Sequence, residues 1–208
     1  MTREACAAIA DGGEIDRAPP PALLRDVLRS ATAEVHQRLH GHPGFAAVQA
    51  GTIDRAAYTA LLRRLYGFHR PFEAAAHVAP ERTRWLESDL AALGIDAAMQ
   101  AALPRCAAFG GGLAPDHLLG ARYVVEGSAL GGRGMARQLD ALLGTGVSAG
   151  RRFFSGHGPA TGDAWRDYLA LLSTIPVTEQ KRAAIVRGAS ATFAIFEQWL
   201  DGWNNHHD

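Results

Sequence analysis

The stretch from Pro21 to His40 reads PALLRDVLRSATAEVHQRLH and decides the class of the fold. Helix-favouring residues dominate it, and apolar side chains recur at spacings of three and four on one stripe. These are Leu24, Leu28, Ala31, Val35 and Leu39. Gly41 and Pro43 follow and are typical of a helix end, so we expect His40 and His42 in a solvated turn. The spacing predicts an amphipathic helix that packs one face against a core.

The remaining sequence has the same character. β-branched residues are scattered and no run alternates with a period of two, so strands are not expected. Helix start and stop signals predict further helices at residues 54–77, 82–93, 96–103, 115–143, 162–172 and 179–200. Asp54 and Thr178 are expected N-caps, and Pro71 should kink its helix. The sequence predicts one all-α domain, a multi-helical bundle over residues 21–203, between a flexible tail at residues 1–20 and a short tail at 204–208.

Composition restricts the partners of the chain. The 21 Lys and Arg residues balance the 21 Asp and Glu residues, so no nucleic acid and no anionic membrane is expected. No apolar run is long enough to span a membrane, and the charged N-terminus does not resemble a signal peptide. Two distant cysteines, Cys6 and Cys106, make neither a zinc pattern nor a disulfide framework, which favours a reducing cytoplasm.

A second stripe on the first predicted helix carries polar groups. Arg29, Ala33, His36 and His40 follow one another at spacings of four, three and four. Arg29 and His36 are two turns apart, about 10 Å along the helix axis. A ligand held by both residues must accept an imidazole at one point and carry an anion at the other, as heme does with its iron and its propionates. The alternative is that His36 is a polar residue at the edge of a core face.

The stretch from Tyr123 to Gly134 reads YVVEGSALGGRG and holds its glycines inside a predicted helix. Each glycine costs about 1 kcal/mol against alanine in a helix interior, so the pattern needs a reason. Gly127, Gly131 and Gly134 share one face, and a bare face lets a flat ligand approach the backbone. Close helix–helix packing is the alternative. A dinucleotide-binding loop is disfavoured because no strand precedes the stretch.

Two motifs resemble those of one enzyme family. Residues 28–36, LRSATAEVH, are similar to the proximal-helix motif of heme oxygenases. Residues 123–132, YVVEGSALGG, resemble the distal-helix motif of the bacterial members. Residues 58–73 resemble the second helix of these proteins, and the whole resemblance runs from about Leu23 to Leu200. It implies a heme-oxygenase-like bundle in which heme is sandwiched between a proximal helix and a kinked distal helix.

The resemblance also assigns residues to heme b. It implies that His36 binds the iron, and that the backbone of one helix covers the opposite face of the ring at Gly127, Ser128, Gly131 and Gly132. Arg29 and Tyr123 take the places of residues that contact the propionates, and Arg166 falls near a third such place in a looser alignment. The family commonly has a carboxylate four residues after the proximal histidine. This chain has His40 there, which is a weaker acceptor for the free ring N–H of His36.

The implied function is a heme-degrading monooxygenase that uses O2 and yields biliverdin, carbon monoxide and ferrous iron. Ser128 and ordered water are expected to hydrogen-bond the reacting oxygen. No flavin or iron–sulfur motif is present, so an external donor such as a ferredoxin or a reductase must supply electrons. A bacteriophytochrome is one candidate recipient of the biliverdin.

Two alternatives remain at this point. One is a heme carrier or sensor that binds through the same residues without turnover. The other is a heme-free protein of the same helical fold, such as a thiaminase-like hydrolase or a di-iron oxidase. A di-iron site needs two Glu-x-x-His units on facing helices, and the sequence contains none.

Overall fold

The computed structural model describes residues 23–203, and every regular element in that range is helical. The α-helices are α1 (Leu24–His40), α2 (Pro43–Ala50), α3 (Arg55–Ala75), α4 (Glu81–Ala92), α5 (Ala97–Ala102), α6 (Pro115–Gln138), α7 (Asp140–Leu143), α8 (Arg152–Ser155), α9 (Thr161–Thr174) and α10 (Glu179–Leu200). Two 3-10 turns, η1 (Ala107–Phe109) and η2 (Gly158–Ala160), complete the described elements. The all-α prediction is confirmed, while the predicted tails at 1–20 and 204–208 lie outside the described residues.

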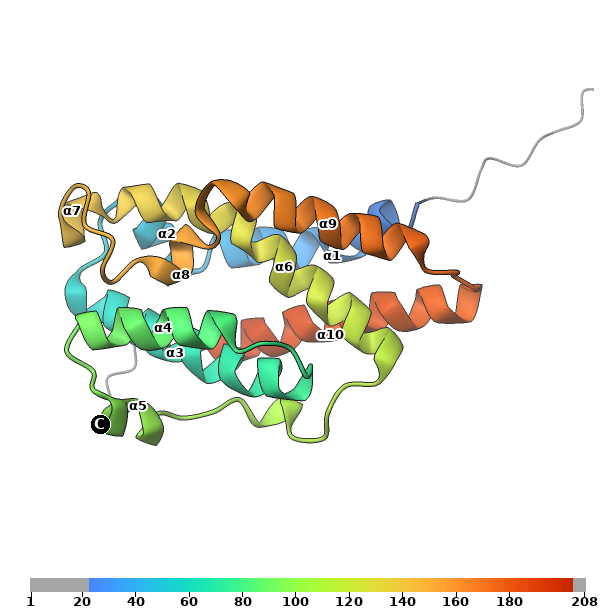
Figure 1. The fold of residues 1–208 in the computed structure, drawn as a ribbon, viewed down its shortest axis with the longest axis horizontal. Helices are drawn as coiled ribbons and strands as arrows, with labels where there is room; N and C mark the ends of the chain where they lie inside the picture. The colour runs from blue at the N-terminus through green and yellow to red at the C-terminus, as the bar shows by residue number, and fades with distance from the viewer. Residues whose placement is uncertain (1–22, 204–208) are drawn as a thin grey trace, which may run out of the picture.

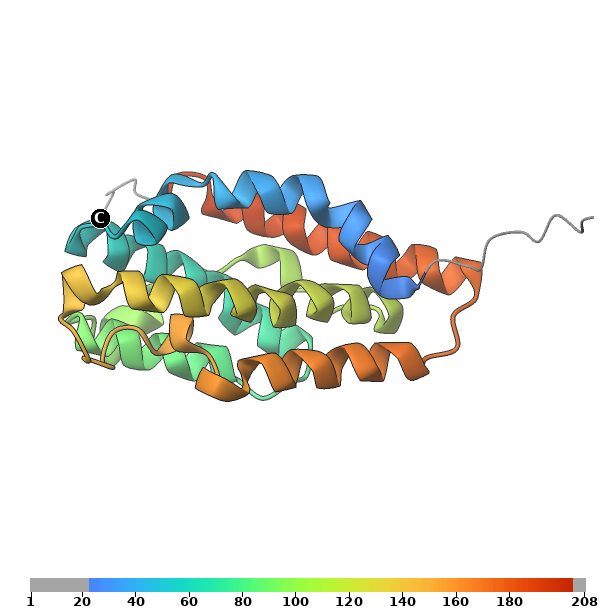
Figure 2. The same ribbon diagram turned by 90° about the horizontal axis from the view of Figure 1, so that it is seen from above.

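Helix α6 crosses the middle of the molecule and packs against helices on both sides (Figure 1). Seen from above, α1 and α10 run side by side along one edge, α9 runs along the other, and α6 lies between them (Figure 2). The pair α3 and α4 lies below α9 and the C-terminal half of α6 in Figure 1. In the same view α6 changes direction between its N-terminal and C-terminal halves. The predicted kinked helix is therefore present.

Side-chain caps begin several helices as the sequence predicts. Asp54 accepts a hydrogen bond from the backbone N–H of Ala57 at 2.8 Å, and Thr178 accepts one from Lys181 at 3.2 Å. Each cap satisfies a donor that has no partner within the first helical turn. The other boundaries lie within a few residues of prediction. Helix α3 continues through Pro71 and ends two residues early, where His77 adopts a left-handed φ of 51°.

Helix α2 was not predicted. His40 and the turn residue Gly41 are exposed, as expected, but the expectation of a solvated turn is wrong for His42. Pro43 stands at the first position of α2, where its missing N–H and fixed φ are tolerated. His42 caps this helix, because its Nδ1 accepts the N–H of Gly44 at 3.2 Å. The ring is half-buried, and this burial lowers the pKa of His42. Pro43 suggested a helix end, but the same residue also begins helices.

The long helix predicted over residues 115–143 is interrupted at Leu139, which separates α6 from α7. The cause is a contact from outside the segment. Arg151 is buried, and its guanidinium donates to the carbonyls of Ala136 at 2.9 Å and of Gly144 at 2.8 Å. It also forms an ion pair with Asp140. These bonds satisfy one carbonyl in the last turn of α6 and one just after α7, so they stabilise the interruption between the two helices.

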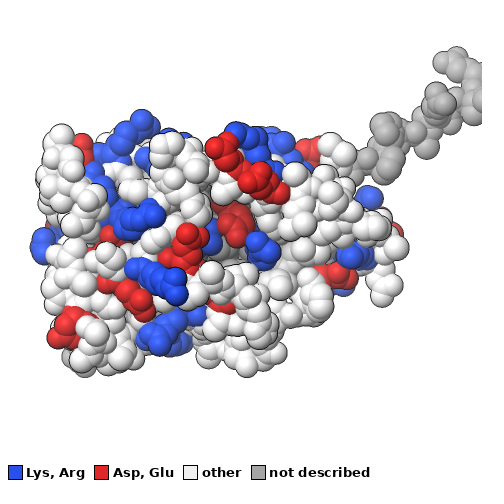
Figure 3. Space-filling model, in the orientation of Figure 1, with Lys and Arg blue, Asp and Glu red and all other residues white. Residues whose placement is uncertain are grey.

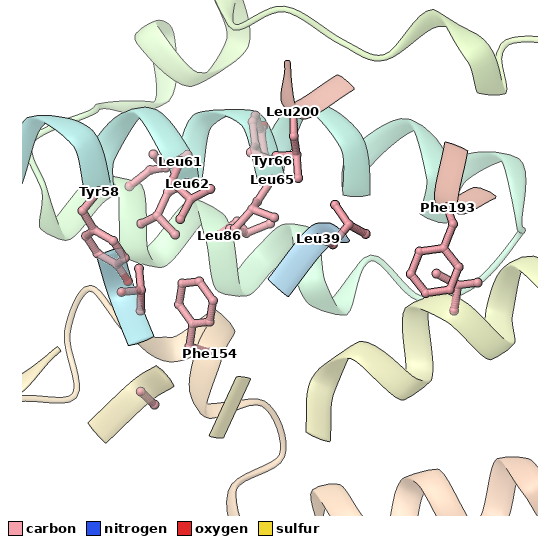
Figure 4. Close-up of a cluster of buried hydrophobic side chains, with 14 of the residues drawn as sticks. Leu39, Tyr58, Leu61, Leu62, Leu65, Tyr66, Leu86, Phe154, Phe193 and Leu200 are labelled. Atoms are coloured by element: carbon pink, nitrogen blue, oxygen red, sulfur yellow. The ribbon is translucent and has the colours of Figure 1, made fainter. Parts of the chain in front are cut away.

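The apolar core fills the space between α3, α4 and the helices around them. Figure 4 shows Tyr58, Leu61, Leu65 and Leu86 packed with Phe154, which comes from α8. Glycines set the approach of α6 to α10. A Cβ on Gly120 would lie 1.9 Å from the carbonyl oxygen of Ile185, and one on Gly188 would lie 2.2 Å from that of His117. The two backbones therefore touch where they cross, and α6 is held firmly at its N-terminal half.

Charges of both signs are mixed over the face shown in Figure 3. This distribution agrees with the zero formal net charge of the sequence. In the part of the chain that the structure describes, no helix is both long enough and apolar enough to cross a membrane.

Candidate functional site

A cavity of about 560 Å³ opens between α1 and α6 and reaches inward to α3, α4 and α8. Its volume falls in the range of sites that bind small molecules and cofactors. Most of its wall is apolar, with aromatic side chains contributed by Phe45, Phe68, Trp85, Phe153, Phe154, Trp165, Phe193 and Phe196. The polar stripe of α1 and the glycine-rich part of α6 both line it, so the tertiary structure joins the two motifs that the sequence singled out.

The α1 wall presents His36 to the cavity, with Arg29 two turns earlier. The His36 ring lies edge-on to His40, with centroids 4.6 Å apart, and 6.2 Å from the ring of Phe193. Partial burial, followed by the charge of His40, lowers the pKa of His36. His36 is therefore neutral at pH 7, which is the form that binds a metal ion.

The glycines of α6 were explained either by a bare face for a flat ligand or by close helix packing, and the structure distinguishes the two at each position. A Cβ on Gly131 would meet no atom within 4 Å, although this residue lines the cavity. The backbone at Gly131 is therefore directly exposed to the open space of the cavity. A Cβ on Gly132 would lie 3.0 Å from the carbonyl oxygen of Phe154, and one on Gly127 would lie 3.3 Å from the ring of Trp165. Those two glycines permit close packing of α6 against α8 and α9. Gly134 is not part of the cavity wall.

Ser128 also lines the cavity, but its hydroxyl proton is committed elsewhere. Its Oγ donates to the carbonyl oxygen of Val125 at 2.8 Å. The Ser128 oxygen can therefore accept a hydrogen bond from a group in the cavity but has no proton left to donate. The sequence predicted a hydrogen bond from Ser128 to the reacting oxygen, and the rotamer in the structure allows only the accepting role.

A buried network of hydrogen bonds, with one ion pair, connects α3 and α4 to α6. The carboxylate of Glu73 accepts the backbone N–H groups of Arg82 at 2.9 Å and Thr83 at 3.0 Å, which caps α4. The guanidinium of Arg82 then reaches α6, where it donates to Glu126 at 2.7 Å and to the Val125 carbonyl at 3.4 Å. Arg82 is paired as well as buried, so its charge is balanced within the fold.

The innermost part of the wall comes from α8. The carboxylate of Asp89, in α4, accepts the backbone N–H groups of Arg152 at 2.7 Å and Phe153 at 2.8 Å. These bonds anchor the short helix so that Phe153 and Phe154 line the cavity. Burial is the main reason why the pKa of Asp89 is raised to about 6.

The rim of the cavity is basic. Arg25 and Arg29 both line it and are both exposed. Tyr123 lies at the same end, with its ring 5.3 Å from that of Trp165. Burial raises the pKa of Tyr123, and the charges of Arg25 and Arg29 oppose that rise. The rim therefore offers two guanidinium groups and one hydroxyl to an anionic ligand.

One predicted site residue lies elsewhere. Arg166 is not part of the cavity wall, and its exposed side chain forms an ion pair with Asp163 one turn earlier in α9. The other seven site residues that the sequence predicts all line the same cavity: Arg29, His36, Tyr123, Gly127, Ser128, Gly131 and Gly132.

The sequence analysis missed several residues of the wall. His69, Arg82 and Trp85 line the cavity and are all buried. His69 had a detectable signal, because it lies four residues after Leu65 and three before Phe72, on the apolar side of its helix. The contact of Arg82 with α6 spans more than forty positions of the chain, so no local pattern indicates it.

The residues present fit an iron porphyrin. The cavity is apolar, as a flat macrocycle requires, and a neutral imidazole faces it from α1. On the other wall a Cβ at Gly131 would fill space that is now free. The arginines at the rim suit carboxylates, which they bind with paired charge-assisted bonds. Among residues 23–203, no three His, Cys, Asp or Glu side chains cluster as a metal site, so the di-iron alternative lacks ligands there.

Comparisons with known proteins agree with this fit. A family model described as heme oxygenase matches residues 23–202. The heme oxygenase of Leptospira interrogans is 18% identical, with a TM-score of 0.70 over 85% of this chain and 97% of that chain. Heme oxygenase-2 of Synechocystis sp., solved with heme and NO, is 20% identical, with a TM-score of 0.71 over 88% of this chain and 85% of that chain.

Heme oxygenase-1 of Synechocystis sp., solved in complex with heme, is 18% identical, with a TM-score of 0.67 over 86% of this chain and 91% of that chain. No curated protein sequence matches. Structural similarity at such low identity shows a shared fold. The family model spans almost all of the described residues, and on that match the chain belongs to the heme oxygenase family.

Proposed function

We propose that this protein is a heme-degrading monooxygenase that converts heme b to biliverdin, carbon monoxide and ferrous iron. One observation carries the proposal. A single apolar cavity places the neutral imidazole of His36 on one wall and the bare backbone at Gly131 on the other, in a chain of the heme oxygenase family. Heme, when bound, supplies both the iron centre for oxygen and the ring that is opened.

The protein's own residues supply placement. His36 would hold the iron from the α1 side through its unprotonated ring nitrogen. The apolar wall excludes water, and the bare surface at Gly131 leaves space for the ring against α6. Ser128 offers an accepting oxygen on the same side. Arg29 and Tyr123, at the rim of the cavity, would hold the propionates and so orient the ring.

Electrons must come from outside, since the sequence carries no motif for a second redox cofactor. A ferredoxin or a reductase is the proposed donor, and a bacteriophytochrome is one proposed recipient of the biliverdin. The proposed compartment is the cytoplasm, because the two cysteines are distant and Cys106 is a buried free thiol.

The test is a spectroscopic turnover assay. Hemin added to the purified protein should give a Soret band, and ascorbate or a ferredoxin system in air should replace that band with biliverdin absorption. Absence of a Soret band contradicts heme binding. A stable Soret band that persists under reducing conditions in air contradicts turnover and favours the carrier or sensor alternative.

A further inference from the structure

The proposed function makes no use of His69, although this residue lies in the cavity wall. Its side chain is only 3% exposed, and it contacts the aromatic rings of Phe68 at 5.3 Å and Phe153 at 5.1 Å, measured between centroids. An apolar side chain would fill such a place without cost. A histidine there buries a polar ring, which is unfavourable unless the ring finds a hydrogen-bond partner.

The surroundings keep His69 neutral. Burial, with the nearby charge of Arg82, holds the pKa of His69 well below its ordinary value. Its Nδ1 is fully enclosed and has no hydrogen-bond partner. Buried N–H groups without an acceptor are rarer in proteins than buried acceptors without a donor. The proton therefore belongs on Nε2, since His69 lines the cavity while its Nδ1 is enclosed without an acceptor.

The neighbouring polar groups explain why a donor is needed. The hydroxyl proton of Ser128 is donated to the Val125 carbonyl, and Nη2 of Arg82 donates to Glu126 and to the same carbonyl. Both residues lie on the α6 side of the cavity. His69 belongs to this side as well, because it contacts Phe153 and the charge of Arg82 acts on it. A ligand that accepts hydrogen bonds on this side thus meets an accepting oxygen at Ser128, while the neutral ring of His69 can supply an N–H donor.

We propose that His69 is a positioning residue that donates a hydrogen bond from Nε2 to a water molecule on the α6 side of the bound heme. This water lies between the N–H of His69 and acceptors such as the oxygen of Ser128. It holds a hydrogen-bond-accepting ligand at the iron without direct contact between His69 and that ligand. The inference rests on the proposed heme binding.

Two measurements test the proposal. In the hemin-free protein, ¹⁵N NMR of the histidine rings should show His69 as the Nε2–H tautomer, unprotonated across the neutral range. In the ferric hemin complex, fluoride serves as a probe because it is a small anion that accepts hydrogen bonds. His69→Leu should weaken fluoride binding about five- to tenfold, the usual effect of losing one hydrogen bond. His69→Gln, which keeps an N–H donor, should recover part of that loss.

His157→Gln is the matched control, because His157 lies outside the cavity wall and faces Glu81 at 3.5 Å. It should bind hemin and fluoride as the wild type does. If His69→Leu binds hemin with a normal Soret band and fluoride with the wild-type constant, the role of His69 is contradicted. A His69 ring that protonates in the neutral range also contradicts it. A wild-type protein without a Soret band contradicts the proposed function instead, so the two failures are distinguishable.

Discussion

The imidazole rings of His36 and His40 meet edge to face, with their centroids 4.6 Å apart, on the wall of the cavity. The charge of His40 adds to burial in lowering the pKa of His36. A carboxylate at the position of His40, as the family commonly has, would act in the opposite direction. In this chain a second histidine thus adds to burial in favouring the neutral form of His36, the residue proposed to bind the iron.

His36→Ala should abolish biliverdin formation, because His36 is the residue proposed to bind the iron in the cavity that Gly131 lines on the opposite wall. The measurement is biliverdin formed from hemin and ascorbate, followed by absorption. Added imidazole should restore part of the activity by occupying the vacated space. Turnover at the wild-type rate without imidazole would remove His36 from the site.

His40→Ala should raise the pKa of His36 toward its ordinary value, because one of the two causes of its lowering is removed. A histidine binds iron only when neutral, so hemin affinity is lost as the pH falls through the pKa of His36. In the variant this loss should begin at a higher pH than in the wild type. NMR titration of the hemin-free proteins measures the pKa directly, and equal values in both proteins would contradict the coupling.

Gly131→Leu should prevent hemin binding while leaving the fold intact. A Cβ at this position meets no protein atom, so the added side chain would project into the space proposed for the ring. Gly134→Leu is the matched control, since a Cβ there is equally unobstructed but outside the cavity wall. Hemin titration with circular dichroism as a check of helix content separates the two variants. Equal hemin affinity in both would show that the ring does not lie against Gly131.

Arg29→Ala should weaken hemin binding by about tenfold, and by at most about a hundredfold, because a charge-assisted hydrogen bond at an exposed rim is partly screened by solvent. It should also mix the biliverdin isomers, since the ring can then settle in more than one rotation. Arg133→Ala, an exposed residue of α6 outside the cavity wall, is the control. Chromatography of the products beside a hemin titration gives both readouts. A single unchanged isomer at unchanged affinity would exclude a role for Arg29.

Because of Asp89, the free energy of unfolding should rise as the pH falls, which is opposite to the usual effect of a carboxylate. Its pKa is raised to about 6 in the fold, above the value of an unfolded aspartate. The folded state therefore binds this proton more tightly, and the contribution of Asp89 to the free energy of unfolding rises as the pH falls from about 7 to about 5, by about 1 kcal/mol. Urea unfolding of wild type and Asp89→Asn at both pH values isolates the effect. A constant difference between the two proteins would contradict the raised pKa.

Local sequence determined most of the helices. Asp54 and Thr178 begin their helices as predicted, because a cap bonds to backbone groups only three residues away. The sequence likewise predicted that Arg29 and His36 lie on one face of α1, since the helical period fixes which residues share a face. Pro43 was ambiguous, because proline can follow one helix or begin the next, and the surrounding structure selected the second.

The tertiary structure alone decided which of these residues face one another. Arg151 bonds to a carbonyl at the end of α6 that the local pattern would have left inside a helix. Asp89 anchors the aromatic residues of α8 from more than sixty positions earlier in the chain. The role of each glycine depends on what lies opposite: open space at Gly131, the Phe154 backbone at Gly132. Arg166 carries the right charge but points to Asp163 and solvent. Such contacts join distant segments, so they depend on how the helices pack and not on the periodicity within any one of them.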